Sequence, residues 1–270
     1  MEFRTPVHIP APGFRIEPLE PLLFVGSCFA DNMGQRFLEE RFPVETNPYG
    51  TMYNPASVLH TIKRWSESHT GPFPRIVFIT LGTNHIYRLK ETGEIVDNCQ
   101  KRPQRLFVEE ELSIEACADY LRQAVSRLQA CRPDVQVVFT VSPIRYAKYG
   151  FHESQLSKAV LLLAVHHVVG SSPSLTYFPA YEIVLDELRD YRFYKEDMLH
   201  PSAQAVEYIW QQLVARYFSP AALQFLKEWK PLKEAFAHRP FHPDSAAYQI
   251  FLAETRQREA DLLARFRQTK

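Results

Sequence analysis

Short apolar runs recur along the chain, and amphipathic stretches separate them. Four of these runs are rich in β-branched and aromatic residues and lack a regular apolar–polar alternation: residues 22–25, 75–81, 135–141 and 175–178. A run without alternation is typical of a strand that is buried on both faces. A further candidate strand lies near residues 42–46. The pattern predicts a sheet that is covered on both sides.

The stretches between these runs have the apolar spacing of helices. They span residues 28–38, 56–65, 114–128, 154–169 and 202–218. Strands that alternate with helices favour parallel pairing, because each helix carries the chain back to the start of the next strand. We therefore predict a three-layer α/β/α fold, of the flavodoxin-like type, with a mainly parallel sheet.

Two segments depart from this rhythm. Residues 85–100 read as a hairpin insertion with its turn at 91–93. The chain from about residue 220 has only helical patterns, and its last segment, 246–267, is amphipathic. We expect an α/β domain over 1–219 and a helical extension over 220–270. The extension would pack on the domain or form a subunit contact in a homo-oligomer.

Charge and hydropathy narrow the function classes. The 31 basic and 31 acidic side chains give a formal net charge of zero, so nothing in the sequence favours a nucleic-acid partner. There is no run of about 18 apolar residues, so we expect no membrane span. The first 14 residues lack the apolar core of a secretory signal. A cytoplasmic protein is the resulting expectation.

Motifs for metals and nucleotide cofactors are missing from the sequence. The four cysteines form no CxxC pair, and the ten histidines form no HxH or HExxH arrangement. No GxGxxG or Walker loop occurs. We therefore expect no metal site and no organic cofactor, and any chemistry must come from side chains.

Polar residues follow the predicted strands where a parallel sheet binds its ligands, at the carboxyl ends. Ser27 follows the first run, and Asn84 and His85 follow the run at 75–81. After the last run, a long excursion carries Asp197 and His200 three positions apart. A serine hydroxyl needs a base to take its proton, and a histidine base needs an acceptor to fix its tautomer.

These residues suit a nucleophilic mechanism in which Ser27 attacks, His200 takes the proton and Asp197 orients His200. The thiol of Cys28, next to Ser27, is an alternative nucleophile. Three donors could stabilise an oxyanion: the Ser27 N–H, the Gly50 N–H and the Asn84 carboxamide. Each also has a purely structural interpretation, as a helix N-cap, a turn glycine and a turn asparagine respectively.

The pentapeptide GSCFA at 26–30 resembles the signature of the GSCFA-domain family. The resemblance reaches into the tail and includes the segments NPYGTMYNP, DNCQKRP, SPIR, LSKAVLLLAVHH and DYRFYKEDMLHPS. That family resembles the SGNH (GDSL-like) hydrolases, which carry a serine, a glycine, an asparagine and a histidine in separate sequence blocks. The resemblance places these blocks at Ser27, Gly50, Asn84 and, with Asp197, His200.

The chain departs from the family pattern at two positions. His85 stands where an SGNH enzyme has an aspartate after the asparagine, and Gln100 stands where the resemblance implies a histidine. Both positions, together with Arg145, are candidates for substrate binding.

The resemblance implies an SGNH-type serine esterase that cleaves a small-molecule or glycan ester, such as an O-acyl or O-acetyl group on a carbohydrate, through an acyl-enzyme on Ser27. Two alternatives stay open. An O-acyltransferase would use the same acyl-enzyme and pass the group to a second alcohol. A non-catalytic binding module would keep the fold without turnover.

Overall fold

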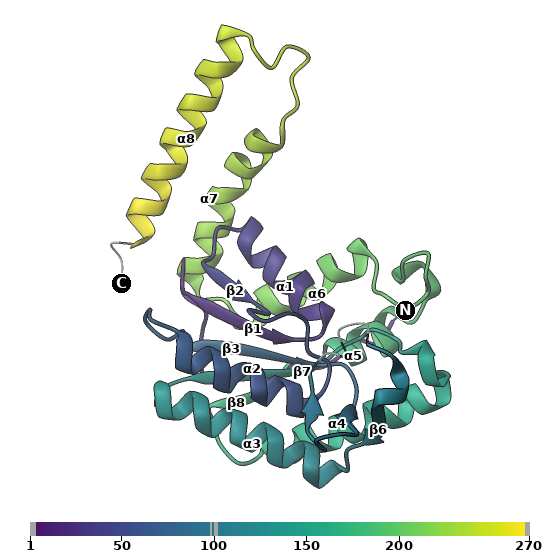
Figure 1. Ribbon diagram of the computed structural model, residues 1–270. Helices are drawn as coiled ribbons and strands as arrows, with labels where there is room; N and C mark the ends of the chain where they lie inside the picture. Colours follow the sequence, from purple (N-terminus) through teal and green to yellow (C-terminus); the bar gives the residue numbers. More distant parts are fainter. Residues whose placement is uncertain (1–3, 98, 100–101, 268–270) are drawn as a thin grey trace.

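A five-stranded sheet forms the centre of the computed structural model, which describes residues 4–97, 99 and 102–267. Its strand order is β2-β1-β3-β7-β8, and every neighbouring pair is parallel (Figure 1). The strands are β1 (Leu22–Gly26), β2 (Val44–Thr46), β3 (Ile76–Leu81), β7 (Gln136–Val141) and β8 (Leu175–Tyr177). Counted within the sheet alone, the order is 2-1-3-4-5, as in flavodoxin-like folds, so the predicted fold class is confirmed.

Helices cover both faces of this sheet, as Figure 1 shows. One face carries α1 and α6, and the other carries α2, α3 and α4. Their bounds are α1 (Cys28–Glu39), α2 (Pro55–Ser68), α3 (Ile114–Cys131), α4 (Phe151–Val169) and α6 (Ala203–Tyr217). Each lies within one helical turn of the bounds that the sequence predicts, because the apolar spacing marks the packed face.

Side chains of the central strands pack alternately into two separate cores. Phe24 of β1 and Phe78 of β3 belong to the core under α1 and α6, and their rings stack with centroids 4.5 Å apart. Leu23 and Val25 belong to the core under α2, α3 and α4. Because both faces are buried, the strands are continuous apolar runs without alternation, as the sequence indicated.

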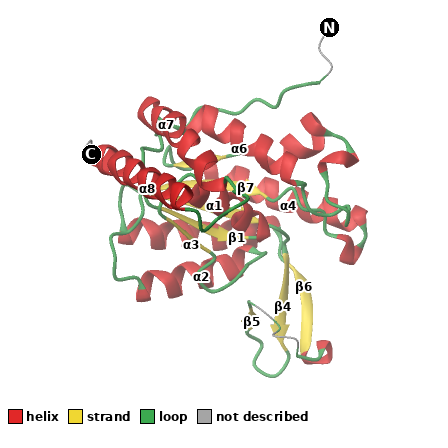
Figure 2. Ribbon diagram, turned by 90° about the horizontal axis from the view of Figure 1, so that it is seen from above, coloured by secondary structure: helices red, strands yellow, loops and turns green. Residues whose placement is uncertain are grey.

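The insertion after β3 is larger than the predicted hairpin. It is a three-stranded antiparallel sheet of order β5-β4-β6 that protrudes from the domain (Figure 2). Its strands are β4 (His85–Leu89), β5 (Ile95–Val96) and β6 (Phe107–Glu111). The predicted hairpin over 85–100 is confirmed by the antiparallel pair β4 and β5. The prediction lacked the third strand, β6, which has the sequence FVEEE. Only Phe107 of this strand is buried, so the sequence has no apolar run that would predict a strand here.

The tail forms two helices, α7 (Pro220–Ala237) and α8 (Ala246–Arg267), that run side by side away from the sheet (Figure 1). Phe225 and Trp229 of α7 belong to the same core as β1, and the indole N–H of Trp229 donates to the Glu39 carbonyl at 3.0 Å. The ring of Phe266 in α8 packs on Phe225 with centroids 5.3 Å apart. The tail thus packs on the domain, and its role in a homo-oligomer stays a prediction.

Strands β1 and β3 approach each other so closely at Gly26 that there is no room for a side chain at this position. Gly26 has φ +141°, and a Cβ there would lie 1.9 Å from the Thr80 carbonyl oxygen. Within the described residues, no helix is both long enough and apolar enough to cross a membrane.

We expect Gly26→Ala to lower the free energy of unfolding by about 3 kcal/mol or more, because β1 and β3 must separate to admit the methyl group. Urea denaturation measures the change. Gly13→Ala is the matched control, since a Cβ there meets no atom within 4 Å, and it should change stability by less than about 1 kcal/mol. Equal effects of the two substitutions would contradict the close approach of the strands.

Candidate active site

Ser27 lies at the point where β1 ends and α1 begins. It is 1% exposed and caps α1, with its Oγ accepting the Phe29 N–H at 3.3 Å. Its own N–H donates to the Thr80 carbonyl at 2.9 Å, and its Oγ lies 3.1 Å from Thr80 Oγ1. The hydroxyl is therefore fixed at the carboxyl end of the sheet, at the positive end of the α1 dipole.

This position is the topological switch point of the sheet. The chain leaves β1 toward β2 on one side and β3 lies on the other, and open parallel sheets bind their ligands at such a point. Thr80, which contacts Ser27 twice, was not singled out from the sequence. The sequence feature that could have identified Thr80 is its hydroxyl, which lies near the end of the buried apolar run at 75–81.

A loop of residues 47–52 wraps around Gly26 and holds it in place. The Gly26 N–H donates to Asn47 Oδ1, and the Met52 N–H donates to the Gly26 carbonyl, both at 2.8 Å. Asn47 Nδ2 in turn donates to Asp31 Oδ1 of α1 at 2.7 Å. Gly50 has φ +94°, and its N–H donates to the Asn47 carbonyl at 2.8 Å. In this structure Gly50 serves a turn, as its structural interpretation expected.

Asp197 and His200 form a short, oriented pair. His200 Nδ1 lies 2.7 Å from Asp197 Oδ2, while Oδ1 of Asp197 accepts the backbone N–H groups of His200 and Leu199 at 2.9 and 2.8 Å. These backbone bonds, followed by the bond from the His200 ring, lower the pKa of Asp197 to about 2. The ionised carboxylate favours the tautomer with hydrogen on Nδ1, which leaves the Nε2 lone pair available as a base.

Two contacts attach the segment 194–201, hereafter the histidine loop, to the edge of the sheet where Ser27 lies. The Arg145 N–H, just after β7, donates to the Leu199 carbonyl at 3.0 Å. The Arg145 Nη1 donates to the Met198 carbonyl, also at 3.0 Å. The bond from the Lys195 N–H to the His200 carbonyl, at 2.8 Å, lies within the loop, and the Lys195 charge acts on the thiol of Cys28, the neighbour of Ser27. Within the residues that the structure describes, Ser27 Oγ bonds Thr80 and Phe29 and forms no hydrogen bond with His200.

Cys28 differs from Ser27 in its chemistry. Burial is the largest influence on its thiol and raises the pKa. Since the thiolate is the nucleophilic form of cysteine, the raised pKa disfavours Cys28 as the attacking group.

Asn84 closes the base of the insertion. Its Nδ2 donates to the Leu112 carbonyl at 2.9 Å, and its own carbonyl accepts the Leu112 N–H at 3.0 Å. These bonds join the two ends of the insertion, so they are long-range contacts rather than the local turn contacts that the sequence suggested. One Nδ2 hydrogen remains for another acceptor, so the oxyanion role stays a prediction.

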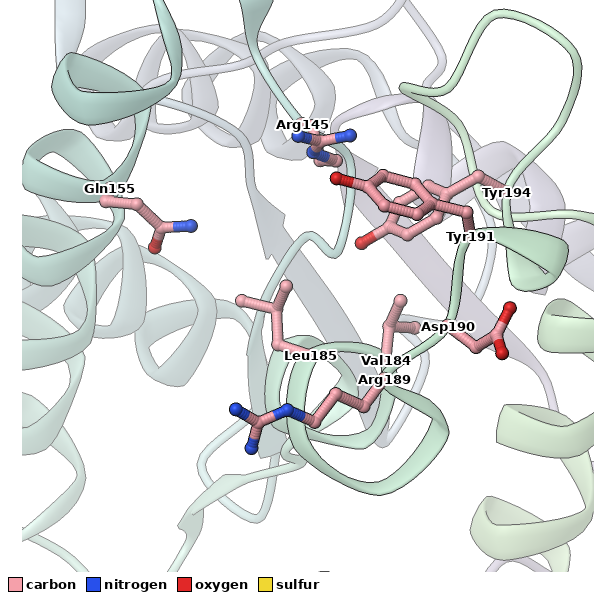
Figure 3. Close-up of a pocket in the computed structure, with 8 residues that line it drawn as sticks. All are labelled: Arg145, Gln155, Val184, Leu185, Arg189, Asp190, Tyr191 and Tyr194. Atoms are coloured by element: carbon pink, nitrogen blue, oxygen red, sulfur yellow. The ribbon is translucent and has the colours of Figure 1, made fainter.

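Two of the candidate substrate-binding residues, His85 and Arg145, have different surroundings. His85 is buried and stacks on Tyr149 with ring centroids 4.1 Å apart, and burial lowers its pKa so that the neutral ring is favoured. Arg145 lines a cavity beside the histidine loop (Figure 3). Gln100 lies outside the described residues.

Sequence reasoning missed Lys158, a lysine that is 2% exposed beneath the site. Its Nζ donates to the carbonyls of Gly82 at 2.7 Å and Ser142 at 2.9 Å, and so joins the segments that follow β3 and β7. Burial lowers its pKa to about 7. The available signal was its spacing on α4, since Lys158 continues the buried stripe of Leu161 and Val165.

Comparisons with known sequences assign a family. The GSCFA family model matches residues 21–72 and 74–213, and the model described as "GSCFA domain protein, C-terminal domain" matches residues 229–269. Among curated proteins, none matches the chain.

Solved structures with a similar fold are distant in sequence. A member of the lipolytic protein G-D-S-L family from Veillonella parvula is 11% identical, with a TM-score of 0.49, over 73% of this chain and 97% of that chain. A putative GDSL-like lipase from Parabacteroides merdae is 11% identical, with a TM-score of 0.49, over 76% and 99%. A carbohydrate esterase family 3 protein from Talaromyces cellulolyticus is 11% identical, with a TM-score of 0.43, over 77% and 98%. Likenesses at this level carry no argument about the reaction.

We expect the stability that Lys158 confers to depend on pH. Its folded pKa of about 7 lies below the ordinary value of 10.5, so between these values the unfolded chain binds more protons and stability rises with pH. The difference in unfolding free energy between the wild type and Lys158→Met should increase from pH 7 to pH 10, by at most ~1.4 kcal/mol per pH unit.

Urea titrations at several pH values measure this difference. Lys63→Met, which removes an exposed lysine of α2, is the matched control and should show a nearly flat difference. A flat difference for Lys158→Met as well would show that the buried amine does not titrate in this range.

Proposed function

This chain belongs to the GSCFA family, and we propose that it is a serine esterase that cleaves a small ester through an acyl-enzyme on Ser27. One observation carries the proposal. An ionised Asp197 is fixed 2.7 Å from His200 Nδ1, on a loop attached to the sheet edge where Ser27 sits at the start of α1. A serine, an oriented imidazole and a carboxylate suit acyl transfer.

In the first step, His200 Nε2 takes the proton of Ser27 as Oγ attacks the ester carbonyl carbon. For this transfer the Ser27 hydroxyl exchanges its contact with Thr80 Oγ1 for one with His200. Catalytic hydrogen bonds in ligand-free enzymes are often long and tighten only with substrate. Asp197 stabilises the imidazolium that forms, because its carboxylate stays charged down to low pH.

The oxyanion that develops on the substrate needs donors. We assign this role to the remaining Asn84 Nδ2 hydrogen, supported by the positive end of the α1 dipole. The N–H groups of Ser27 and Gly50 bond the carbonyls of Thr80 and Asn47, so we leave them out of the proposed oxyanion hole.

The C–O bond to the alcohol then breaks as the imidazolium gives its proton to the leaving oxygen, and the acyl-enzyme is formed. In the second half of the reaction, His200 takes a proton from water as the water attacks the acyl carbon, and it returns this proton to Ser27 Oγ as the acid leaves. The substrate class we propose is an O-acyl or O-acetyl ester on a carbohydrate. Transfer of the acyl group to a second alcohol would use the same residues, and exclusion of water from the site would decide between the two outcomes.

A fluorophosphonate probe and a small acetyl ester test the nucleophile. We expect the wild type to be labelled and to hydrolyse the ester, Ser27→Ala to lose both, and Asp197→Asn to lose about three to four orders of magnitude in kcat. Mass spectrometry should locate the label on the peptide that contains Ser27.

Ser219→Ala is the matched control, because Ser219 is also a buried helix cap but begins α7, in the tail. Loss of a cap costs about 1 kcal/mol, so this variant should keep its labelling. A wild type that stays unlabelled and inactive on all esters would instead favour the binding module. An acyl product formed only with an added alcohol would identify the transferase.

A further inference from the structure

A cavity of about 270 Å³ lies next to the histidine loop. Its walls come from the segment after β7, the start of α4 and the π-helical stretch Ile183–Leu188 with the residues that follow it (Figure 3). Sites for drug-sized ligands usually measure ~300–1,000 Å³, so this cavity suits one small ring or a part of it.

Two guanidinium groups line the cavity. Arg145 lies against the rings of Phe151, Tyr191 and Tyr194, with its Cζ 3.9, 5.7 and 5.5 Å from their centroids. These rings hold the guanidinium in place, and its Nη1 uses one hydrogen for the Met198 carbonyl at 3.0 Å. Among the described residues, no acceptor bonds the other side-chain N–H groups of Arg145, so these groups can meet a ligand. Arg189 supplies the second cation from the opposite wall (Figure 3).

No carboxylate in the cavity balances these charges. Asp190 is the acidic residue of the lining, but Oδ2 pairs with Arg192 at 3.2 Å and Oδ1 accepts the Arg192 N–H at 2.9 Å. Figure 3 shows the Asp190 carboxylate turned away from the cavity. Within the described part of the chain, neither Arg145 nor Arg189 forms an ion pair.

Arg189 is the C-terminal cap of the π-helical stretch. It has φ 41° and ψ 38°, in the left-handed region. This conformation is common where a helix ends, and it sets the direction in which the side chain leaves the helix. The N–H of Arg189 donates to the Val184 carbonyl at 3.0 Å, which holds the residue in this conformation.

The position of the cavity indicates which part of the ester it would bind. Arg145 bonds the histidine loop twice, through its N–H to the Leu199 carbonyl and through Nη1 to the Met198 carbonyl. In the proposed mechanism, the leaving oxygen receives its proton from His200, so the alcohol part of the ester lies on the side of this loop. The cavity therefore adjoins the alcohol part rather than the acyl part.

Resting on the proposed function, we propose that this cavity binds an anionic group, a carboxylate or a phosphate, on a sugar that forms the alcohol part of the ester. Guanidinium groups bind both anions through paired N–H donors. The ring of Tyr191, which is 66% exposed, offers an apolar face to the sugar.

Matched substrates test this assignment. Three acetylated methyl glycosides differ only at C6: a glucoside, a glucuronoside and a glucoside 6-phosphate. We expect the wild type to prefer at least one anionic substrate in kcat/KM, and Arg145→Gln or Arg189→Gln to lower the ratio of anionic to neutral kcat/KM by about tenfold or more.

Arg192→Gln is the matched control, since Arg192 is a neighbouring arginine outside the cavity lining, and it should leave the ratio unchanged. Arg189→Lys keeps the charge and should retain part of the preference. Circular dichroism and thermal midpoints identify variants that fail to fold, and the lysine variant then carries the comparison.

Binding to Ser27→Ala, measured by calorimetry, separates this inference from the esterase proposal. Glucuronate or glucose 6-phosphate should bind more tightly than glucose, and Arg189→Gln in the same background should weaken that binding. Such binding without turnover of any ester would contradict the esterase proposal and support the anion-binding role of the cavity. Turnover with equal use of the three substrates, or equal binding of inorganic phosphate and the sugar anions, would overturn the subsite.

Discussion

The close approach of β1 and β3 at their carboxyl ends is the constraint on which the rest of the structure depends. Gly26 gives the room, because any side chain there would collide with the Thr80 carbonyl. The same contact lets the Ser27 N–H bond that carbonyl and brings the two hydroxyls together. The close packing of β1 and β3 at Gly26 thus fixes the position of the next residue, Ser27, at the carboxyl end of the sheet.

Buried polar groups hold the loops around this point. Lys158 and Ser157 extend from α4 and bond the segments that follow β3 and β7, and Asn47 holds Gly26 from the other side. Buried polar groups are stable only when they are bonded, and a buried ammonium is costly even then. A lysine kept in such a place, with backbone carbonyls as its partners, ties the geometry of the site to the stability of the domain.

The histidine loop connects the reaction to recognition. Its Asp197–His200 pair is fixed by bonds within four residues, while Arg145 attaches the loop to the sheet and also lines the neighbouring cavity. Arg145 therefore has two roles: it supports the loop that carries His200, and it lines the cavity that would receive the substrate. A charged substrate group that binds Arg145 would therefore act, through this one residue, on the loop that positions the imidazole of His200.

The sequence by itself determined the parallel sheet, its helices and the local Asp197–His200 pair, because hydrophobic periodicity and a spacing of three residues act over short distances along the chain. It did not reveal β6, whose exposed glutamates hide its pairing with β4. Only the tertiary structure decided that Thr80 bonds Ser27, that Asn84 bonds Leu112 across the base of the insertion, and that Lys158 joins the segments after β3 and β7. Those contacts join residues far apart in sequence, and their partners are chosen by packing rather than by local pattern.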